Sequence, residues 1–249
     1  LTVSDPGLVP ASRPAPCPPI SARPDSLSLT RVEVLIRDPY AIFADKVLRL
    51  KPLKPLRQGP DARDRGTVVH KVLERFVRER PEGEAPESAM TRLLALTEEE
   101  LASQVPWPAA RIQWKARIER AANHFLTVDR EAGEGTVVLE EEGELVLPLL
   151  SFRLFGTPDR IDVLPDGRLH LIDYKTGAPP SEKQIKSFAK QLHLAALLAV
   201  EGGFRSLGPA EVAKITYVGL GGEGKEVIED ITPAVLEQTR NGLARLLAP

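Results

Sequence analysis

The sequence predicts an α/β (α+β) fold in which helices flank a central mixed β-sheet, with a helical extension on the N-terminal side. Helical spacing of apolar residues dominates residues 28–130, whereas short strand-like segments separated by turn residues dominate residues 137–175. A further helix, two strands and a last helix follow this cluster. Helices before and after a group of strands are typical of a sheet that helices cover.

The N-terminal half is predicted to be a linker followed by helices. Residues 1–26 are rich in Pro, Ser and Ala and lack periodicity, which is typical of a linker or tail. Residues 28–50 have helical spacing that Pro39 interrupts, and residues 61–80, 88–104 and 107–130 predict three further helices. The helix over 61–80 has an apolar stripe made of Val68, Val69, Val72, Leu73, Phe76 and Val77.

The C-terminal half is predicted to contain the sheet. Strands are expected over 137–147 and 151–164, joined near Pro148, and over 168–175, 212–220 and 225–231. Helices are expected over 181–200, beginning at Ser181, and over 233–247. We therefore expect a single domain over residues 27–249, with a helical part at 27–130 and a sheet core at 131–249.

A β-hairpin is predicted around the turn residues at 165–167, and its register follows from the alternation of side chains along a strand. A three-residue loop over 165–167 pairs Ile161 with Leu171 and Asp159 with Asp173, so that apolar positions meet apolar positions and the two acids face each other. A two-residue loop would instead place Asp159 opposite Tyr174, on the other face. The pattern therefore favours the three-residue loop.

Asp159, Asp173 and Lys175 are the candidate catalytic residues. Asp173 and Lys175 lie two positions apart on one strand, so they project from the same face. Two opposed carboxylates repel each other unless a cation lies between them, and carboxylate oxygens are ligands that hard divalent cations prefer. An acid pair with a lysine at the end of a strand indicates metal-dependent cleavage of phosphodiester bonds.

These motifs resemble a known family of nucleases. Gly-x-x-Asp-Arg-Ile-Asp at 156–162, followed by Ile-Asp-Tyr-Lys-Thr-Gly at 172–177, is similar to the PD-(D/E)xK nuclease superfamily in its RecB-like branch. A Gly-x-x-x-His motif that ends at His70, a Gln motif at Gln191 and the segment 28–43 resemble the same branch. Over residues 26–200 the set is most similar to the C-terminal nuclease domain of AddB subunits of bacterial AddAB helicase–nucleases, which implies a restriction-endonuclease-like fold.

The resemblance implies further site residues. His70 and the backbone carbonyl of Tyr174 would join Asp159 and Asp173 as metal ligands, for Mg²⁺ or Mn²⁺, and an imidazole ligand suits Mn²⁺ better. Gly66 would let the helix that bears His70 approach another backbone closely.

Two supporting residues are left with alternatives. Gln191 either contacts DNA phosphate in the active site or is an amide bonded to backbone. Glu74 either accepts a hydrogen bond from His70 or forms a salt bridge with Arg75 or Arg78.

The chain departs from many AddB proteins in lacking the cysteines of an iron–sulfur cluster. Such a cluster needs about four thiolates, and Cys17 is the only cysteine of the chain. We therefore expect no iron–sulfur cluster and expect apolar packing of the N-terminal segment on the nuclease core instead, with truncation of Phe43 costing on the order of 3–5 kcal/mol. The apolar groups available are Leu29, Val32, Leu35, Ile36, Tyr40 and Phe43. A second departure is Ala195, where the family often has Tyr.

Composition limits the partners and the compartment. A net charge of −2 argues against gripping nucleic acid by bulk charge, so DNA would meet local basic surface or be delivered by another subunit. One cysteine fits a reducing compartment such as the cytoplasm, and no apolar run is long enough to span a membrane. The first residue is Leu rather than Met, so we expect a fragment of a longer protein without a signal peptide.

The sequence thus predicts a divalent-metal-dependent DNA exonuclease domain, with Lys175 acting on the attacking water. The resemblance implies an AddA-type helicase–nuclease subunit as partner, single-stranded ends from unwound duplex as substrate, and a role in double-strand break resection and recombinational repair. Two alternatives stay open. One is a free-standing RecB-like exonuclease of the CRISPR-associated type, and the other is a catalytically decayed nuclease fold that acts as a DNA-binding scaffold.

Overall fold

The computed structural model describes residues 15–53, 56, 59–132, 136–147, 151–222 and 224–248. Residues 1–14 of the expected linker and Pro148, near which two strands were expected to join, lie outside these ranges. Between residue 15 and the first strand, the chain forms one short 3-10 helix, η1 (Ile20–Ala22).

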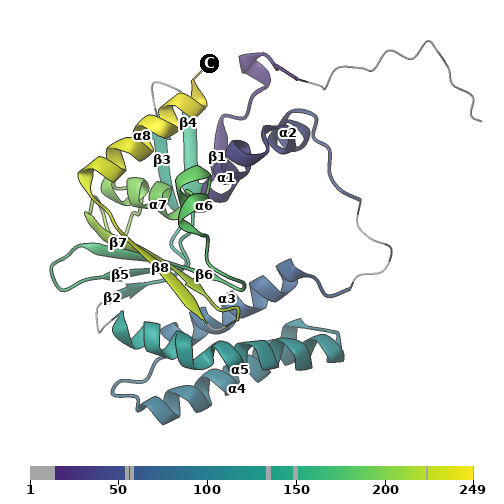
Figure 1. The fold of residues 1–249 in the computed structure, drawn as a ribbon, viewed down its shortest axis with the longest axis vertical. Coiled ribbons are helices and arrows are strands. Elements are labelled where there is room, and N and C mark those ends of the chain that lie inside the picture. The colour runs from purple at the N-terminus through teal and green to yellow at the C-terminus, as the bar shows by residue number, and fades with distance from the viewer. Residues whose placement is uncertain are drawn as a thin grey trace, which may run out of the picture.

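A five-stranded mixed sheet forms the centre of the molecule, as the sequence predicts (Figure 1). Its order is β2 (Thr136–Val138), β5 (Arg160–Val163), β6 (Leu169–Lys175), β7 (Val212–Gly219) and β8 (Lys225–Asp230). β6 and β7 are parallel, and the other neighbours are antiparallel. Helices cover both faces of β6, so six of its seven residues are buried, which is typical of a central strand.

A second, three-stranded sheet corrects the strand predictions. The segments 137–147 and 151–164 are each divided between the two sheets rather than forming single strands. β3 (Gly143–Leu147) and β4 (Phe152–Gly156) pair with each other, and β1 (Ser26–Ser28) is parallel to β4. Pro158 follows β4 and has no backbone N–H to extend a ladder, while Glu140 has a positive φ of 53° between β2 and β3. These two breaks let the paired segments leave one sheet and enter the other.

The predicted register of the β5–β6 hairpin is confirmed. Ile161 pairs with Leu171, and Val163 pairs with Leu169. The Leu164 N–H donates to the Arg168 carbonyl at 2.8 Å, which closes a three-residue loop. Gly167 has a φ of 83°, the left-handed conformation that this loop requires. The same register extends toward Asp159 and Asp173, so it directs both acids to one face.

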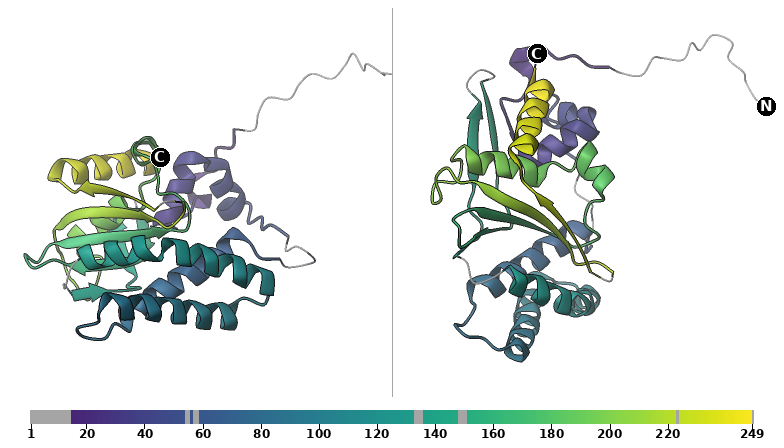
Figure 2. Two further views of the ribbon diagram at one scale, coloured as in Figure 1. Left: turned by 60° about the horizontal axis from the view of Figure 1, so that its bottom comes forward. Right: turned by 60° about the vertical axis from the view of Figure 1, so that its left-hand side comes forward.

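Three helices form a layer on one face of the five-stranded sheet (Figures 1 and 2). They are α3 (Ala62–Arg78), α4 (Pro86–Gln104) and α5 (Pro108–Glu131). Phe125 of α5 lies edge-on to Phe76 of α3 and to Tyr174 of β6, with ring centroids 5.4 and 5.7 Å apart. This core takes up the side chains of β6 that point away from Asp173 and Lys175.

A buried ion network joins this layer to the sheet. The Arg160 side chain is fully buried and donates to Asp162 at 2.5 Å and to Asp129 of α5 at 2.6 Å. Arg80 also contacts Asp129. Arg160 and Asp162 therefore have a structural role, because the network connects β5 to α5.

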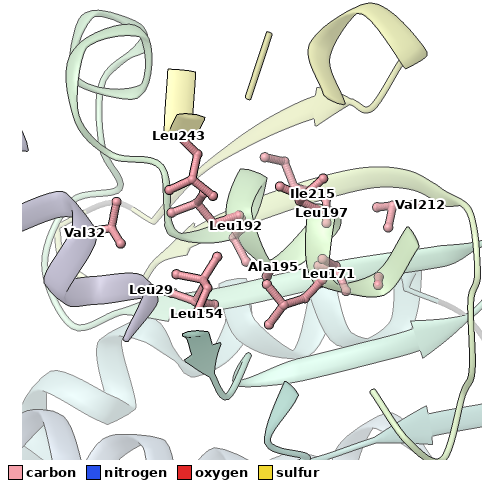
Figure 3. Close-up of a cluster of buried hydrophobic side chains, with 14 of the residues drawn as sticks. Leu29, Val32, Leu154, Leu171, Leu192, Ala195, Leu197, Val212, Ile215 and Leu243 are labelled. Carbon is pink, nitrogen blue, oxygen red and sulfur yellow. The ribbon is translucent and has the colours of Figure 1, made fainter. Parts of the chain in front are cut away.

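The opposite face of the sheet is covered by α7 (Gln191–Val200), with α8 (Pro233–Leu247) beyond it (Figure 1). Residues 191–199 of α7 are all buried, because the sheet, α1 (Leu29–Arg37) and α8 surround this helix. Figure 3 shows Leu192, Ala195 and Leu197 of α7 between Leu171 and Ile215 of the sheet and the neighbouring helices.

The segment predicted as one helix over 181–200 is two helices. α6 (Glu182–Ser187) begins with a capping box between Ser181 and Gln184, and α7 begins only at Gln191. The Tyr217 hydroxyl occupies the break, because it donates to the Ala189 carbonyl at 3.3 Å and accepts from the Leu192 N–H at 3.4 Å. Gln184 and Gln191 therefore do not share a helix face.

The N-terminal segment docks on the core with a different set of residues from the one expected. It consists of α1 (Leu29–Arg37), α2 (Pro39–Ile42) and the π-helical turn η2 (Phe43–Val47). Leu29 and Val32 are buried as expected and appear in Figure 3, but Tyr40 is 51% exposed. Ile42 is buried and Phe43 only half-buried, so the large truncation cost predicted for Phe43 belongs to Ile42. Ile36 is also at the surface, and Leu35 is partly buried against the core.

Candidate active site

The C-terminal end of β6 brings the three candidate catalytic residues together. Asp159 lies one residue before β5, and its Oδ2 accepts a hydrogen bond from the Tyr174 N–H at 2.7 Å. Asp173 and Lys175 project from the same face of β6, with the Lys175 Nζ 2.7 Å from Asp173 Oδ2. Two acids and a lysine thus meet where the sequence predicts, at the end of a rigid central strand.

Asp173 is the more deeply buried of the two acids. Its side chain is almost fully inaccessible, whereas that of Asp159 is 19% exposed. Burial, and then the charge of Asp159, raise the pKa of Asp173 to about 7, against the opposing effect of Lys175 and His70. The buried Asp173 Oδ2 is paired with the Lys175 ammonium, which offsets part of the cost of burying this carboxylate.

His70 projects from α3, in the helical layer, toward Asp159. Its Nδ1 lies 3.1 Å from Asp159 Oδ1. Burial lowers the pKa of His70, but the hydrogen bond and charge of Asp159, the charge of Asp173 and the Tyr174 carbonyl raise it more, so the net pKa is raised. The imidazole is therefore oriented by both an acid of the pair and the backbone between the two motif residues.

Tyr174 contributes backbone rather than side chain to the site. Its ring packs on Phe125 in the helical layer. Its N–H holds Asp159, and its carbonyl acts on His70. The alternation along β6 thus sends the Tyr174 ring to the core, while its N–H binds Asp159 and its carbonyl acts on His70.

Lys175 is held by groups from three elements. Besides Asp173, its Nζ donates to Gln191 Oε1 at 3.3 Å and lies 6.0 Å from the centre of the Tyr217 ring. Burial lowers the pKa of Lys175, but the charges of Asp173, Asp159 and Glu33 raise it more, so the ammonium form is favoured. Gln191, which is buried, therefore lies at the site, in contact with the lysine.

Glu74 and Gly66 both lie on α3, and neither contributes to the site. The Glu74 carboxylate forms ion pairs with Arg78 and, at 2.8 Å, with Lys71, so of the two alternatives for this residue the structure contains the salt bridge. A methyl group at Gly66 would meet nothing within 4 Å, so this glycine does not serve a close backbone approach.

Close backbone approach occurs instead at Gly219, the last residue of β7, and at Gly221, two residues further on. A methyl group at Gly219 would lie 2.4 Å from Pro179, and one at Gly221 would lie 2.9 Å from the Gly177 backbone. These two glycines let the loop that follows Lys175 pack tightly on the end of the neighbouring strand.

Glu33 of α1 is a residue of the site that the sequence analysis missed. Its Oε1 accepts from the Gln191 N–H at 2.8 Å. Burial raises the pKa of Glu33, although the N–H groups of Gln191 and Lys190 and the charge of Lys175 act in the other direction. A signal was available, because Glu33 follows Leu29 and Val32 at the spacing of an apolar stripe, where an acid is unexpected.

The donor set suits a divalent cation, although the side chains are paired with one another. In the described residues, no group of three or more His, Cys, Asp and Glu side chains is arranged to hold a metal ion. Asp159 is engaged by His70 and by the Tyr174 N–H, and Asp173 by Lys175. Two carboxylates, a carbonyl and an imidazole nevertheless match the ligands that Mg²⁺ and Mn²⁺ take.

A fold of this kind with acids and a lysine at a strand end defines a class of nucleases. Residues 26–248 match the PD-(D/E)XK nuclease superfamily. The chain belongs to this superfamily, and its mixed sheet between helices is the restriction-endonuclease-like fold that the sequence predicts. Within the described residues, no helix is both long and apolar enough to span a membrane.

The relatives of the chain are longer proteins. It is 27% identical to an uncharacterized protein of Rickettsia bellii over 245 residues, which cover 90% of this chain and 29% of that protein. It is 28% identical over 159 residues to an ATP-dependent helicase/deoxyribonuclease subunit of Streptococcus equi subsp. zooepidemicus, covering 64% of this chain and 15% of that relative. The chain therefore spans less than a third of the length of these curated relatives.

A solved structure is similar at a lower level. The alignment with the "Putative exonuclease" of Eubacterium rectale covers 90% of this chain and 80% of the chain in that structure, with 10% identity and a TM-score of 0.49.

Proposed function

We propose that this chain is a divalent-metal-dependent deoxyribonuclease domain that hydrolyses phosphodiester bonds. The observation that supports this most is the meeting of Asp159, Asp173 and Lys175 at the end of β6, in a chain of a nuclease superfamily. An intact set of two acids and a lysine is expected of an active enzyme and has no evident use in a scaffold.

Asp159, Asp173, His70 and the Tyr174 carbonyl would hold the cation, as Mg²⁺ or Mn²⁺. When bound, such an ion supplies Lewis acidity towards the scissile phosphate and the attacking water. With the cation bound, Asp159 and His70 would both contact the cation instead of each other. The Tyr174 N–H would still hold the Asp159 carboxylate in place.

Lys175 is the residue that acts on the reacting atoms. Its ammonium, held by Asp173 and Gln191, would orient the attacking water and stabilise the negative charge that develops on the phosphoryl oxygens. A bond from the water oxygen to phosphorus forms and the bond from phosphorus to O3′ breaks. One water proton is lost to solvent or a nearby base, and the O3′ leaving group takes up a proton. The products are a 5′-phosphate and a 3′-hydroxyl.

The longer relatives suggest the setting of this activity. The chain aligns with part of a protein named as a subunit of an ATP-dependent helicase/deoxyribonuclease. We infer that the domain works within a helicase–nuclease together with an AddA-type subunit, and that it degrades the 5′-ended strand of unwound duplex during double-strand break resection for recombinational repair. If so, Asp173→Asn in the whole protein should sensitise cells to double-strand breaks.

Cleavage of end-labelled single-stranded DNA tests the proposal. The wild type should shorten the strand with Mg²⁺ or Mn²⁺ and be inactive with a chelator. Lys175→Ala should lower the rate by about 10²–10⁴-fold, the usual contribution of a group that acts on proton transfer or developing charge. Labels on the 5′ and 3′ ends separate exonuclease polarity from internal cutting.

Lys190→Ala is a matched control, because Lys190 lies beside Gln191 but outside the acid pair. This variant should retain the metal-dependent cleavage. A wild type that binds DNA but cleaves nothing with either metal would contradict the proposal and favour the scaffold, and a Lys175→Ala variant as active as the wild type would contradict the role of the lysine.

A further inference from the structure

Glu33 connects the N-terminal helix to the active site over a long stretch of chain. It lies on α1, 158 residues before Gln191, and its Oε1 accepts the Gln191 N–H at 2.8 Å. Its side chain is half-buried where α1 packs against α7 (Figure 1). A charged side chain at a packed helix contact is costly unless it has hydrogen-bond partners.

The partner that Glu33 finds is the start of α7. The first N–H groups of a helix lack intrahelical acceptors, and side chains usually satisfy them from the preceding residue. Lys190 stands at that position, and its ammonium side chain has no acceptor to offer the first N–H groups, so α7 has no side-chain cap of its own. Glu33 therefore caps α7 from another element, and its negative charge also suits the positive end of the helix.

Gln191 links this cap to the lysine. The residue whose N–H Glu33 accepts is the one whose side-chain Oε1 accepts from the Lys175 Nζ. The backbone of Gln191 cannot shift without moving that oxygen. The charges of Glu33 and Lys175 also act favourably on each other.

We propose that Glu33 is a positioning residue of the nuclease site, which fixes the start of α7 so that Gln191 holds Lys175 beside the acid pair. This role rests on the proposed function, because it assumes that Lys175 acts in DNA cleavage. It makes the N-terminal helix a part of the site.

Substitutions at Glu33 separate hydrogen bonding from charge. Glu33→Gln keeps an acceptor oxygen at the same distance and should stay close to the wild type. Glu33→Leu removes the acceptor at similar volume and should lower kcat by about 10- to 100-fold, as loss of an orienting partner does at metal sites. KM for DNA should change little, since the proposed role of Glu33 is to hold Gln191 and involves no contact with DNA. Glu33→Asp, whose side chain is one methylene shorter, should also lower kcat. This variant replaces Glu33→Leu in the experiment if the Glu33→Leu protein does not fold.

Coupling to Gln191 distinguishes positioning from general destabilisation. If Glu33 acts through Gln191, the double variant Glu33→Leu/Gln191→Ala should be no slower than Gln191→Ala alone. Asp38→Ala is the matched control, because Asp38 caps α2 of the same segment through the Ala41 N–H and does not touch the site. It should lower stability without changing kcat.

A readout independent of activity follows the hydrogen bond itself. Amide hydrogen exchange at Gln191 should be fast in Glu33→Leu and slow in the wild type and in Glu33→Gln. The proposal is overturned if folded Glu33→Leu cleaves as fast as the wild type, if its loss adds fully to that of Gln191→Ala, or if Glu33→Gln is as slow as Glu33→Leu. An inactive wild type would overturn the proposed function instead, and the exchange of Gln191 would still decide whether Glu33 holds α7.

Discussion

His170 shows how differently one strand treats neighbouring titratable residues. It lies on β6 three residues before Asp173, on the opposite face, and its Nε2 is 2.7 Å from the Thr216 hydroxyl. Burial, with the positive charges of Lys214 and Arg160, lowers the pKa of His170 to about 3. The residue is therefore neutral in the folded protein over the whole physiological range and belongs to the structure, not to the site.

This burial predicts a pH dependence of stability. The unfolded chain protonates His170 near pH 6.5, whereas the folded chain does so only near pH 3. The contribution of His170 to the free energy of unfolding is thus complete above pH 6.5. It is lost as the pH falls from there toward 3, by about 1.4 kcal/mol per pH unit.

Urea unfolding of the wild type and of His170→Gln between pH 7 and pH 4 measures this contribution. As the pH falls from 6.5, the free energy of unfolding of the wild type should decrease relative to that of His170→Gln by about 1.4 kcal/mol per pH unit. His193, whose pKa burial also lowers, is present in both proteins and cancels in the comparison. Parallel stability curves for the two proteins would show that His170 keeps its ordinary pKa.

Among the elements, the β5–β6 hairpin is the one that sequence alone describes best. Its register depends on interactions within 17 residues, 159–175, because turn chemistry and the alternation of apolar side chains specify the same pairing. Asp159, Asp173 and Lys175 are part of that local pattern. Their convergence could therefore be predicted from the order of residues along the chain.

Elements that depend on distant partners could not be predicted in the same way. The segment 181–200 has no proline or glycine to indicate a break, and the groups that stabilise the break come from Tyr217 and Glu33. The division of residues 137–164 between two sheets likewise depends on β1, which pairs with β4 from the far N-terminal side. The sequence signal at such places is weak because the stabilising contacts are long-range.

The N-terminal segment packs on the core through Ile42 and not through Tyr40. Ile42 of α2 is 3% exposed and belongs to the main core, whereas Tyr40, two residues earlier, is 51% exposed. Ile42→Ala should lower the free energy of unfolding by about 2–5 kcal/mol, as for a buried aliphatic side chain. Tyr40→Ala should change it by only about 0.5 kcal/mol. Chemical denaturation of both variants measures the difference, and equal losses would contradict this packing of α2.

On the scale of the whole molecule, β6 belongs to two cores. Leu169 and Leu171 contribute to the core under α7 and α8, while Ile172 and Tyr174 contribute to the core under α3, α4 and α5. The Arg160 network adds a second connection between sheet and helical layer. If either helical layer unfolded, one apolar face of β6 would become exposed to water.

This sharing predicts a single cooperative unfolding transition. Both tryptophans, Trp107 and Trp114, lie in or next to α5, so their fluorescence reports on the helical layer alone, whereas far-ultraviolet circular dichroism reports on all elements. The two signals should have the same midpoint in guanidinium. Fluorescence that changes at a clearly lower denaturant concentration would show that the helical layer unfolds by itself.

The acids gathered at the end of β6 are expected to bind a divalent cation, and calorimetric titration of the metal-free protein with Mn²⁺ measures this binding. The wild type should bind Mn²⁺, and a hundredfold excess over Kd should stabilise it by about 2.7 kcal/mol. Asp159→Asn and Asp173→Asn should each abolish or severely weaken binding. Asp166→Asn, in the exposed turn of the same hairpin, should leave it unchanged. A wild type that does not bind Mn²⁺, or an Asp173→Asn variant that binds it as tightly as the wild type, would contradict this expectation.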